Sequence, residues 1–111
     1  MNAPDFLSDE RIEKALEFLT HSAKDYAEAK GLRVWLEHKI KTHKSAAFLA
    51  NEGSVAEREA RAYVSDEYRS ATDALRDAIV DEEKLRALRV AAEAKIEVWR
   101  STQANLRAAN I

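Results

Sequence analysis

The stretch that decides the fold runs from Lys44 to Tyr68 and reads KSAAFLANEGSVAEREARAYVSDEY. It contains Gly53, one of only two glycines in the chain, between two segments of helical pattern. Glycine adopts the positive φ that ends many helices, because it has no Cβ atom to clash. Ser54-Val55-Ala56-Glu57 then fits a capping box, in which the Ser54 hydroxyl accepts from the Glu57 amide and the Glu57 carboxylate accepts from the Ser54 amide. One helix is therefore predicted to end here and another to begin.

A second helix start follows at Ser65, with Asp66 and Glu67 in the first turn, where acids favour the helix dipole. Long helical patterns lie on both sides of the stretch. The predicted fold is all-α: a long antiparallel helical hairpin with coiled-coil-like arms and a short helical elbow. We expect a flexible lead-in over residues 1–7, from which Phe6 and Leu7 dock back onto the helices, and a single helical domain over residues 8–111. Its parts are arm one at about 8–52, the elbow at about 54–64 and arm two at about 66–108.

Both arms carry an apolar stripe at near seven-residue spacing. In arm one the stripe is Ile12, Ala15/Leu16, Leu19, Ala23, Tyr26, Ala29, Leu36, Ile40 and Ala47; in arm two it is Tyr68, Ala71, Leu75, Ala78, Leu85, Ala92, Ile96, Trp99 and Leu106. Arg33, Glu82 and Arg89 interrupt the stripes. Gly31 lies in mid-helix, but the stripe resumes in phase after it, so we expect arm one to be continuous.

Several apolar side chains fall outside the seam that the hairpin would bury. They are Phe18, Trp35, Phe48, Ile79, Val80, Leu88 and Val98. Helices of this length need tertiary burial to be stable in water. The excess of apolar side chains therefore predicts self-association into a homo-oligomer, or contact with another protein.

The composition excludes several classes of protein. The net charge of −2 gives no bulk attraction to nucleic acid, so any such binding needs a local cluster of cations. There is no cysteine and hence no disulfide framework. No basic leader and no apolar run of 18 residues is present, which predicts no membrane association and a soluble, cytoplasmic protein.

Catalysis and metal binding are not indicated. His21, His38 and His43 match no metal-ligand spacing, and the chain has no Gly-rich phosphate loop and no strained nucleophile turn. We therefore expect no catalytic residues, no metal and no cofactor, and a protein that is not an enzyme.

The segment from Lys30 to Lys44 is the one region with a strong charge character. It holds five cationic side chains against one acid, Glu37. One interpretation is a nucleic-acid-binding face, in which cations neutralise phosphates and an indole stacks on a base. The alternative is an ordinary solvated helix face with the indole in the core. The candidate binding residues are Lys30, Arg33, Trp35, Lys39, Lys41 and Lys44.

The chain resembles small helical proteins of phages and prophages that are encoded among DNA recombination genes. The resemblance rests on Trp35-Leu36 followed by Lys39-Ile40-Lys41, on the elbow from Phe48 to Ala60, and on Ile96–Ser101 with Asn105-Leu106-Arg107. More loosely, the chain is similar to the phage recombination mediators of the UvsY type. This resemblance implies an oligomeric protein that binds single-stranded DNA and contacts a recombinase. It implies Lys39, Lys41 and Lys44 as phosphate contacts, with Arg33 and Trp35 as secondary contacts.

Two functions are therefore expected. The first is a non-enzymatic recombination accessory that binds single-stranded DNA through the basic face of arm one. The second is a protein–protein adaptor or inhibitor of phage origin that acts through exposed apolar helix faces. Neutralisation of the basic face by acids of arm two would favour the adaptor. The acids in question are Asp73, Asp77, Asp81, Glu82 and Glu83.

Overall fold

The computed structural model describes residues 7–110 of the 111-residue chain. Of the lead-in expected over residues 1–7, only Leu7 falls within this range, and it is buried. The expectation for residues 1–6 lies outside the described residues.

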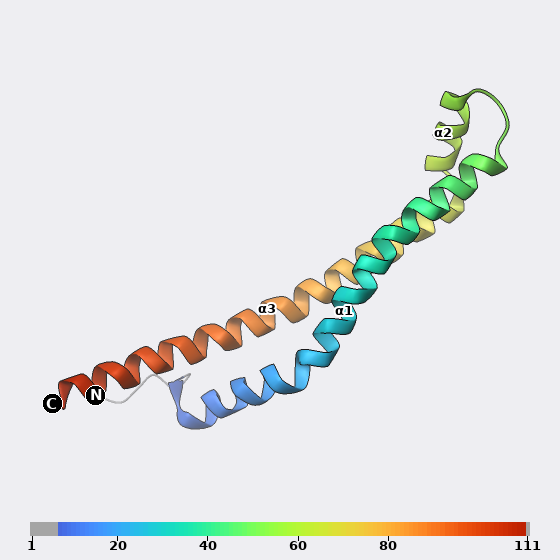
Figure 1. Cartoon of the computed structure of the whole chain (residues 1–111). Helices are drawn as coiled ribbons and strands as arrows, with labels where there is room; N and C mark the ends of the chain where they lie inside the picture. Colours follow the sequence, from blue (N-terminus) through green and yellow to red (C-terminus); the bar gives the residue numbers. More distant parts are fainter. Residues whose placement is uncertain (1–6, 111) are drawn as a thin grey trace. The chain divides into compact units, whose positions relative to one another are not determined.

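Residues 7–110 form three α-helices (Figure 1). They are α1 (Asp9–Ala50), α2 (Val55–Tyr63) and α3 (Asp66–Ala109). Residues 7–110 contain no strand. The prediction of an all-α helical hairpin with a short helix between two long arms is confirmed.

Serines begin each of the three helices. The Ser8 hydroxyl accepts a hydrogen bond from the Arg11 amide at 3.4 Å, and the Ser65 hydroxyl accepts one from the Tyr68 amide at 3.3 Å. Ser54 caps α2 in the same way, accepting from the Glu57 amide at 3.2 Å. These bonds satisfy amides that have no partner inside the helix.

Gly53 makes the turn before α2 possible. Its φ of +115° is a conformation that side chains with a Cβ rarely adopt. A Cβ built there would lie 2.6 Å from Oε2 of Glu57. The predicted helix end at this glycine is therefore explained by backbone conformation and by the close approach of the first turn of α2.

The described residues divide into two compact units. The terminal unit consists of residues 7–26 and 84–110, and pairs the start of α1 with the second part of α3. The elbow unit consists of residues 27–83, and holds the rest of α1, α2 and the first part of α3. The single domain predicted over residues 8–111 stays a prediction.

A seam with seven-residue spacing forms the core of each unit. Most of its buried positions are small: Ala15, Ser22, Ala47, Ala78 and Ala92, joined by Ile12 and Glu82. Small side chains let two helix backbones approach each other closely, so the seam is narrow. Ala62 of α2 is completely buried and fixes the short helix within the elbow unit.

The predicted stripe is wrong at two positions. Ala23 and Leu106 are exposed, and Ser22 is buried one position before Ala23. Of the two alternatives Ala15 and Leu16, Ala15 is buried and Leu16 is exposed. Ser22 lies seven residues after Ala15, so it is Ser22 and not the neighbouring alanine that continues the seven-residue repeat on the buried side of the helix. Periodicity was the better guide here than residue type.

Gly31 does not interrupt α1, which runs without a break from Asp9 to Ala50. A Cβ at Gly31 would meet no atom within 4 Å, since this position is exposed. The continuity expected from the phase of the stripe is therefore confirmed.

Of the seven apolar side chains predicted to lie outside the seam, five are exposed. They are Trp35, Ile79, Val80, Leu88 and Val98. Phe18 and Phe48 are half-buried. None of the helices within residues 7–110 has the length and apolar character that crossing a bilayer would require.

Candidate nucleic-acid interface

Arg33 lies in the seam of the elbow unit, and its guanidinium is paired with carboxylates of the same chain. Its guanidinium donates two hydrogen bonds to the carboxylate of Glu82 on α3, from Nε and from Nη2, and a third from Nη1 to Glu37 at 2.7 Å. Glu82 is only 5% exposed. The bonds to Glu82 and then to Glu37 raise the pKa of Arg33 above its ordinary value. Arg33 therefore links α1 to α3, and its positive charge is compensated by two carboxylates that a phosphate would have to displace.

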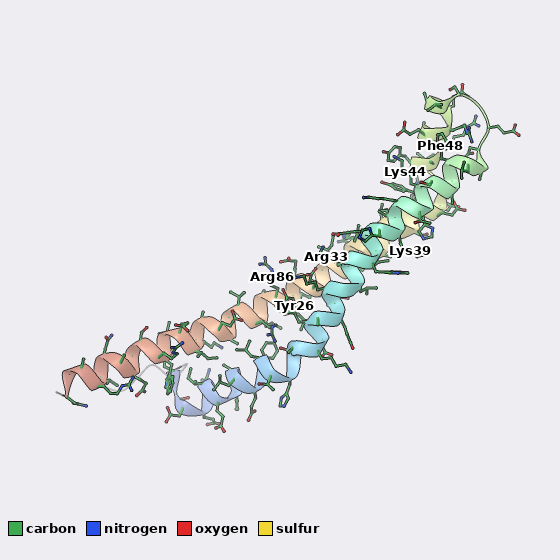
Figure 2. All side chains as sticks on the ribbon, viewed as in Figure 1. Tyr26, Arg33, Lys39, Lys44, Phe48 and Arg86 are labelled. Carbon is green, nitrogen blue, oxygen red and sulfur yellow. The ribbon has the colours of Figure 1, made fainter. Side chains whose placement is uncertain are left out.

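Lys44 is engaged by the short helix. Lys44 lies near Phe48 toward the end of α1 (Figure 2). Its Nζ donates to the Tyr63 hydroxyl at 2.5 Å and lies 3.5 Å from a carboxylate oxygen of Glu59. The same Nζ sits 3.9 Å from the centre of the Tyr63 ring. The hydrogen bond to Tyr63 is the main cause of a raised pKa at Lys44. This lysine fastens α2 to α1.

Two further contacts hold α2 against the end of α1. Arg58 donates from Nε to the Phe48 carbonyl at 3.3 Å, and its guanidinium lies 4.5 Å from the Phe48 ring centre. Arg61 donates to the Glu52 carbonyl at 2.9 Å. The residues of α2 that meet the basic segment were missed by sequence reasoning. The one available signal was the spacing of Tyr63 and Glu59, which places both on one face of α2 one turn apart.

Lys39 and Trp35 form a separate pair. Nζ of Lys39 lies 5.3 Å from the centre of the Trp35 ring, and the indole is 55% exposed. The alternative that placed this indole in the core is thus wrong. Both residues line a groove of about 460 Å³ in the elbow unit. Asp66 and Glu67 of α3 also line it, so the groove is not uniformly basic.

Lys30 and Lys41 are exposed, and neither has a partner among residues 7–110. Eleven residues, about three turns, separate them, so both lie on one side of α1. Lys39 lies nine residues from Lys30, about half a turn out of phase, on the opposite side. The six candidate residues are therefore divided among the seam, the α2 contact and two different faces of α1. They do not make one continuous basic surface.

The polar residues that interrupt the stripes all have partners. Besides Arg33 and Glu82 in the elbow unit, Arg89 of the terminal unit donates to the Ser22 hydroxyl at 2.7 Å and to the Leu19 carbonyl at 2.8 Å. Its guanidinium lies 5.4 Å from the Tyr26 ring centre. Sequence periodicity located Arg33, Glu82 and Arg89 as interruptions of the stripes but could not identify the residues with which they form hydrogen bonds.

Nothing within residues 7–110 gathers three or more His, Asp or Glu side chains in a way that would hold a metal ion. Comparisons with protein-family models, with curated protein sequences and with solved structures found no match. Function therefore has to be argued from the chain's own geometry.

Proposed function

We propose that the chain is a non-enzymatic protein-interaction module, whose elbow unit binds a partner protein through the exposed apolar surface around Trp35. The observation that carries this proposal is the groove lined by Trp35, Leu36, Ala71 and Ala74, with Lys39 and His43 on one side and Asp66 and Glu67 on the other. Tryptophan is the residue most often found at the energetic centre of protein interfaces. The two acids would repel phosphates from the same indole.

Engagement of two of the five cations, Arg33 and Lys44, by the hairpin itself supports the same proposal. Arg33 is bound by Glu82 and Glu37, and Lys44 by Tyr63 and Glu59. Neutralisation by an acid of arm two was the outcome expected to favour an adaptor. A partner helix with apolar side chains at i, i+3/i+4 and i+7 fits an elongated apolar groove of this kind.

The test is photo-crosslinking in cells. A photoreactive phenylalanine replaces Trp35 in one variant and Leu106 in another, because both positions are exposed to a similar extent, 55% and 53%. We expect a discrete crosslinked partner from position 35 alone. Affinity capture with Trp35→Ala should then lose that partner, while Leu106→Ala retains it. Equal crosslinking from both positions, or capture that Trp35→Ala does not change, would contradict the proposal.

Binding of single-stranded DNA is a second candidate, because Lys30 and Lys41 are exposed without partners in residues 7–110 and Lys39 lies over an exposed indole. On this proposal the chain is a recombination accessory that also contacts a recombinase. Fluorescence anisotropy with a labelled oligonucleotide at two salt concentrations tests it. Salt-sensitive binding that is abolished in Lys39→Ala/Lys41→Ala/Lys44→Ala would favour DNA over a protein partner. No binding at low salt would exclude DNA.

A further inference from the structure

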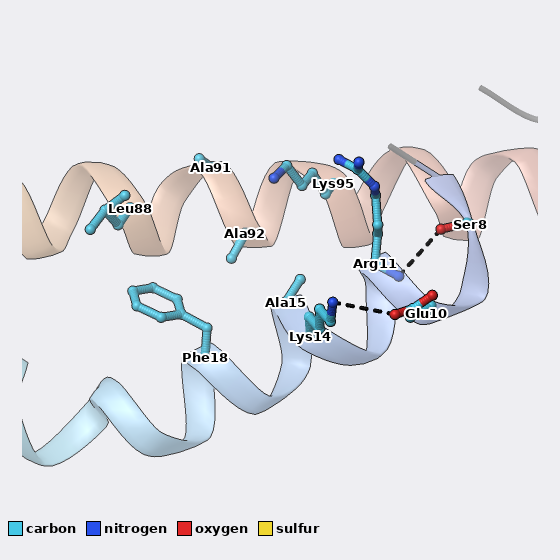
Figure 3. Close-up of a pocket in the computed structure, with 10 residues that line it drawn as sticks. All are labelled: Ser8, Glu10, Arg11, Lys14, Ala15, Phe18, Leu88, Ala91, Ala92 and Lys95. Atoms are coloured by element: carbon cyan, nitrogen blue, oxygen red, sulfur yellow. Dashed lines mark hydrogen bonds and ion pairs between the residues drawn. The ribbon is translucent and has the colours of Figure 1, made fainter. Parts of the chain in front are cut away.

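A second apolar groove lies in the terminal unit and is independent of the surface around Trp35. This groove of about 550 Å³ is floored by Ala15 and Phe18 of α1 with Leu88 and Ala92 of α3, and Lys14 and Lys95 stand at its edges. Figure 3 shows the Phe18 ring pointing across from α1 toward Leu88 and Ala92. We call it the terminal groove. Leu88 is 57% exposed although it lines the groove, so the chain alone leaves this surface uncovered.

The charge around the terminal groove is positive on balance. Nζ of Lys14 lies 3.3 Å from a carboxylate oxygen of Glu10, but both side chains are at least 70% exposed, so this pair is weak. Lys95 has no partner among residues 7–110. A groove with an apolar floor and ammonium groups at its edges fits a helix that presents carboxylates beside an apolar side chain.

The chain carries such a helix face itself. Asp73, Asp77 and Val80 of α3 are spaced i, i+4 and i+7, which places them on one side of the helix. We call this face the acidic stripe. All three side chains are exposed, Val80 to 38%. Asp73 has no partner within the described range, and Asp77 lies 3.9 Å from an exposed Arg76, a distance at which an ion pair contributes little.

The distance between the apolar and the charged residue is the same on both surfaces, but their order along α3 is reversed. Leu88 precedes Lys95 by seven residues, and Asp73 precedes Val80 by seven residues, which in both cases is about 10 Å along a helix. When two copies of α3 run antiparallel, Val80 of one meets Leu88 of the other, and Asp73 meets Lys95. The apolar pair is then covered at the same time as Asp73 is paired with Lys95. In the same register Asp77 aligns with Ala91, and the exposed Lys84 of one copy lies opposite Lys84 of the other.

We propose that the terminal groove is the docking site for the acidic stripe of a second copy of this chain. Each copy offers one groove and one stripe, so a two-fold pair satisfies both contacts. The inference goes beyond the proposed binding of a partner protein, because it uses other residues and a different ligand. It names which surfaces of the chain would mediate the expected self-association.

Charge reversal on each surface tests this pairing. The groove variant is Lys14→Glu/Lys95→Glu and the stripe variant is Asp73→Lys/Asp77→Lys. Each variant alone places like charges in both contacts and should weaken self-association at least about tenfold, as measured by sedimentation velocity over a concentration series. An equimolar mixture of the two variants pairs opposite charges in both contacts, so we expect association to return in the mixture.

The outcomes are distinct. Wild-type chain that stays monomeric at the highest concentration tested would overturn the proposal. So would variants that associate as strongly as wild type, or a mixture no better than its components. Circular dichroism checks that each variant keeps its helicity.

A second comparison decides the question if charge reversal disturbs folding. Leu88→Ser removes the apolar contact within the terminal groove, whereas Leu106→Ser changes a leucine of similar exposure on the same helix outside it. Weaker association in Leu88→Ser alone supports the proposal. Equal effects of the two substitutions contradict it.

Discussion

The two units each place one arginine in an apolar seam, and they neutralise it by different means. In the elbow unit, Arg33 meets the carboxylate of Glu82, which is 5% exposed. In the terminal unit, Arg89 meets a hydroxyl and a carbonyl, those of Ser22 and Leu19. A buried carboxylate that loses its cation must either remain as an unpaired charge in apolar surroundings or take up a proton, and both cost free energy, whereas a hydroxyl or a carbonyl is neutral from the start. The comparison indicates that replacing the arginine should cost more stability in the elbow unit than in the terminal unit.

The largest effect is therefore expected for Arg33→Met. Methionine keeps the length and apolar character of the stem but leaves Glu82 without its main partner. We expect the thermal unfolding midpoint, followed by circular dichroism, to fall by at least about 10 °C. Lys30→Met, at an exposed position without a partner in residues 7–110, is the matched control and should change the midpoint little.

Removing both charges should reverse most of this loss. In Arg33→Met/Glu82→Leu the seam becomes apolar at both positions, and replacing a buried pair by apolar side chains of similar size is often neutral or stabilising. The midpoint of the double variant should return to within about 5 °C of wild type or exceed it. A double variant no more stable than Arg33→Met would show that the stranded carboxylate is not the cause.

A smaller effect is expected for Arg89→Met. The substitution removes two hydrogen bonds but leaves only neutral groups behind, and Ser22 can turn its hydroxyl to a carbonyl of its own helix. We expect the thermal midpoint to fall by about 5 °C, roughly half the loss of Arg33→Met. Equal losses in Arg33→Met and Arg89→Met would break the comparison between the two seams.

Gly31→Ala sharpens the comparison by raising the stability of α1 beside Arg33 without a new contact. Alanine should stabilise the helix by about 1 kcal/mol, because the position is exposed and a Cβ there meets no atom within 4 Å. Urea unfolding of Gly31→Ala, alone and combined with Arg33→Met, measures the gain. The same gain in both backgrounds would show that the loss at Arg33 is electrostatic and not a consequence of a weak helix. A loss of stability would contradict the exposed, helical position of Gly31.

The smallest effect concerns the contact between Lys44 and Tyr63. Because the hydrogen bond to Tyr63 raises the pKa of Lys44, the protonated lysine stabilises the folded chain below the ordinary lysine value of 10.5. This contribution is lost as pH rises through the raised pKa. In Tyr63→Phe the pKa of Lys44, measured by NMR titration, should move down toward 10.5, while helicity at neutral pH stays unchanged. A pKa of Lys44 that does not move would contradict the contact.

The course of the chain could be predicted from its sequence because local signals determine it. Gly53, Ser54 and Ser65 mark the elbow through backbone conformation and capping, which depend on residues close in the sequence. The continuity of α1 across Gly31 could be predicted for the same reason, because the seven-residue spacing of apolar residues is also a local pattern. The wrong choice of Ala23 over Ser22 came from weighing residue type above the strict repeat.

The candidate site was less predictable, since its state depends on contacts between distant residues. Forty-nine residues separate Arg33 from Glu82, and 19 separate Lys44 from Tyr63. Charge counting along one helix treats both cations as available to a phosphate, and only the pairing of the helices shows that they are engaged. The exposure of Trp35 was likewise undecided, because an indole at the edge of a stripe faces the core or the solvent according to the register of the opposite helix.

The two tryptophans give each unit its own optical reporter. They are the only two in the chain, with the exposed Trp35 in the elbow unit and Trp99 in the terminal unit, where its indole Nε1 is buried. A water-soluble quencher reaches the exposed indole of Trp35 more readily than the half-buried indole of Trp99, so fluorescence of the wild-type chain separates into two components without any label. Trp35→Phe and Trp99→Phe would assign them, and the order in which the units lose structure could then be followed in a single unfolding experiment.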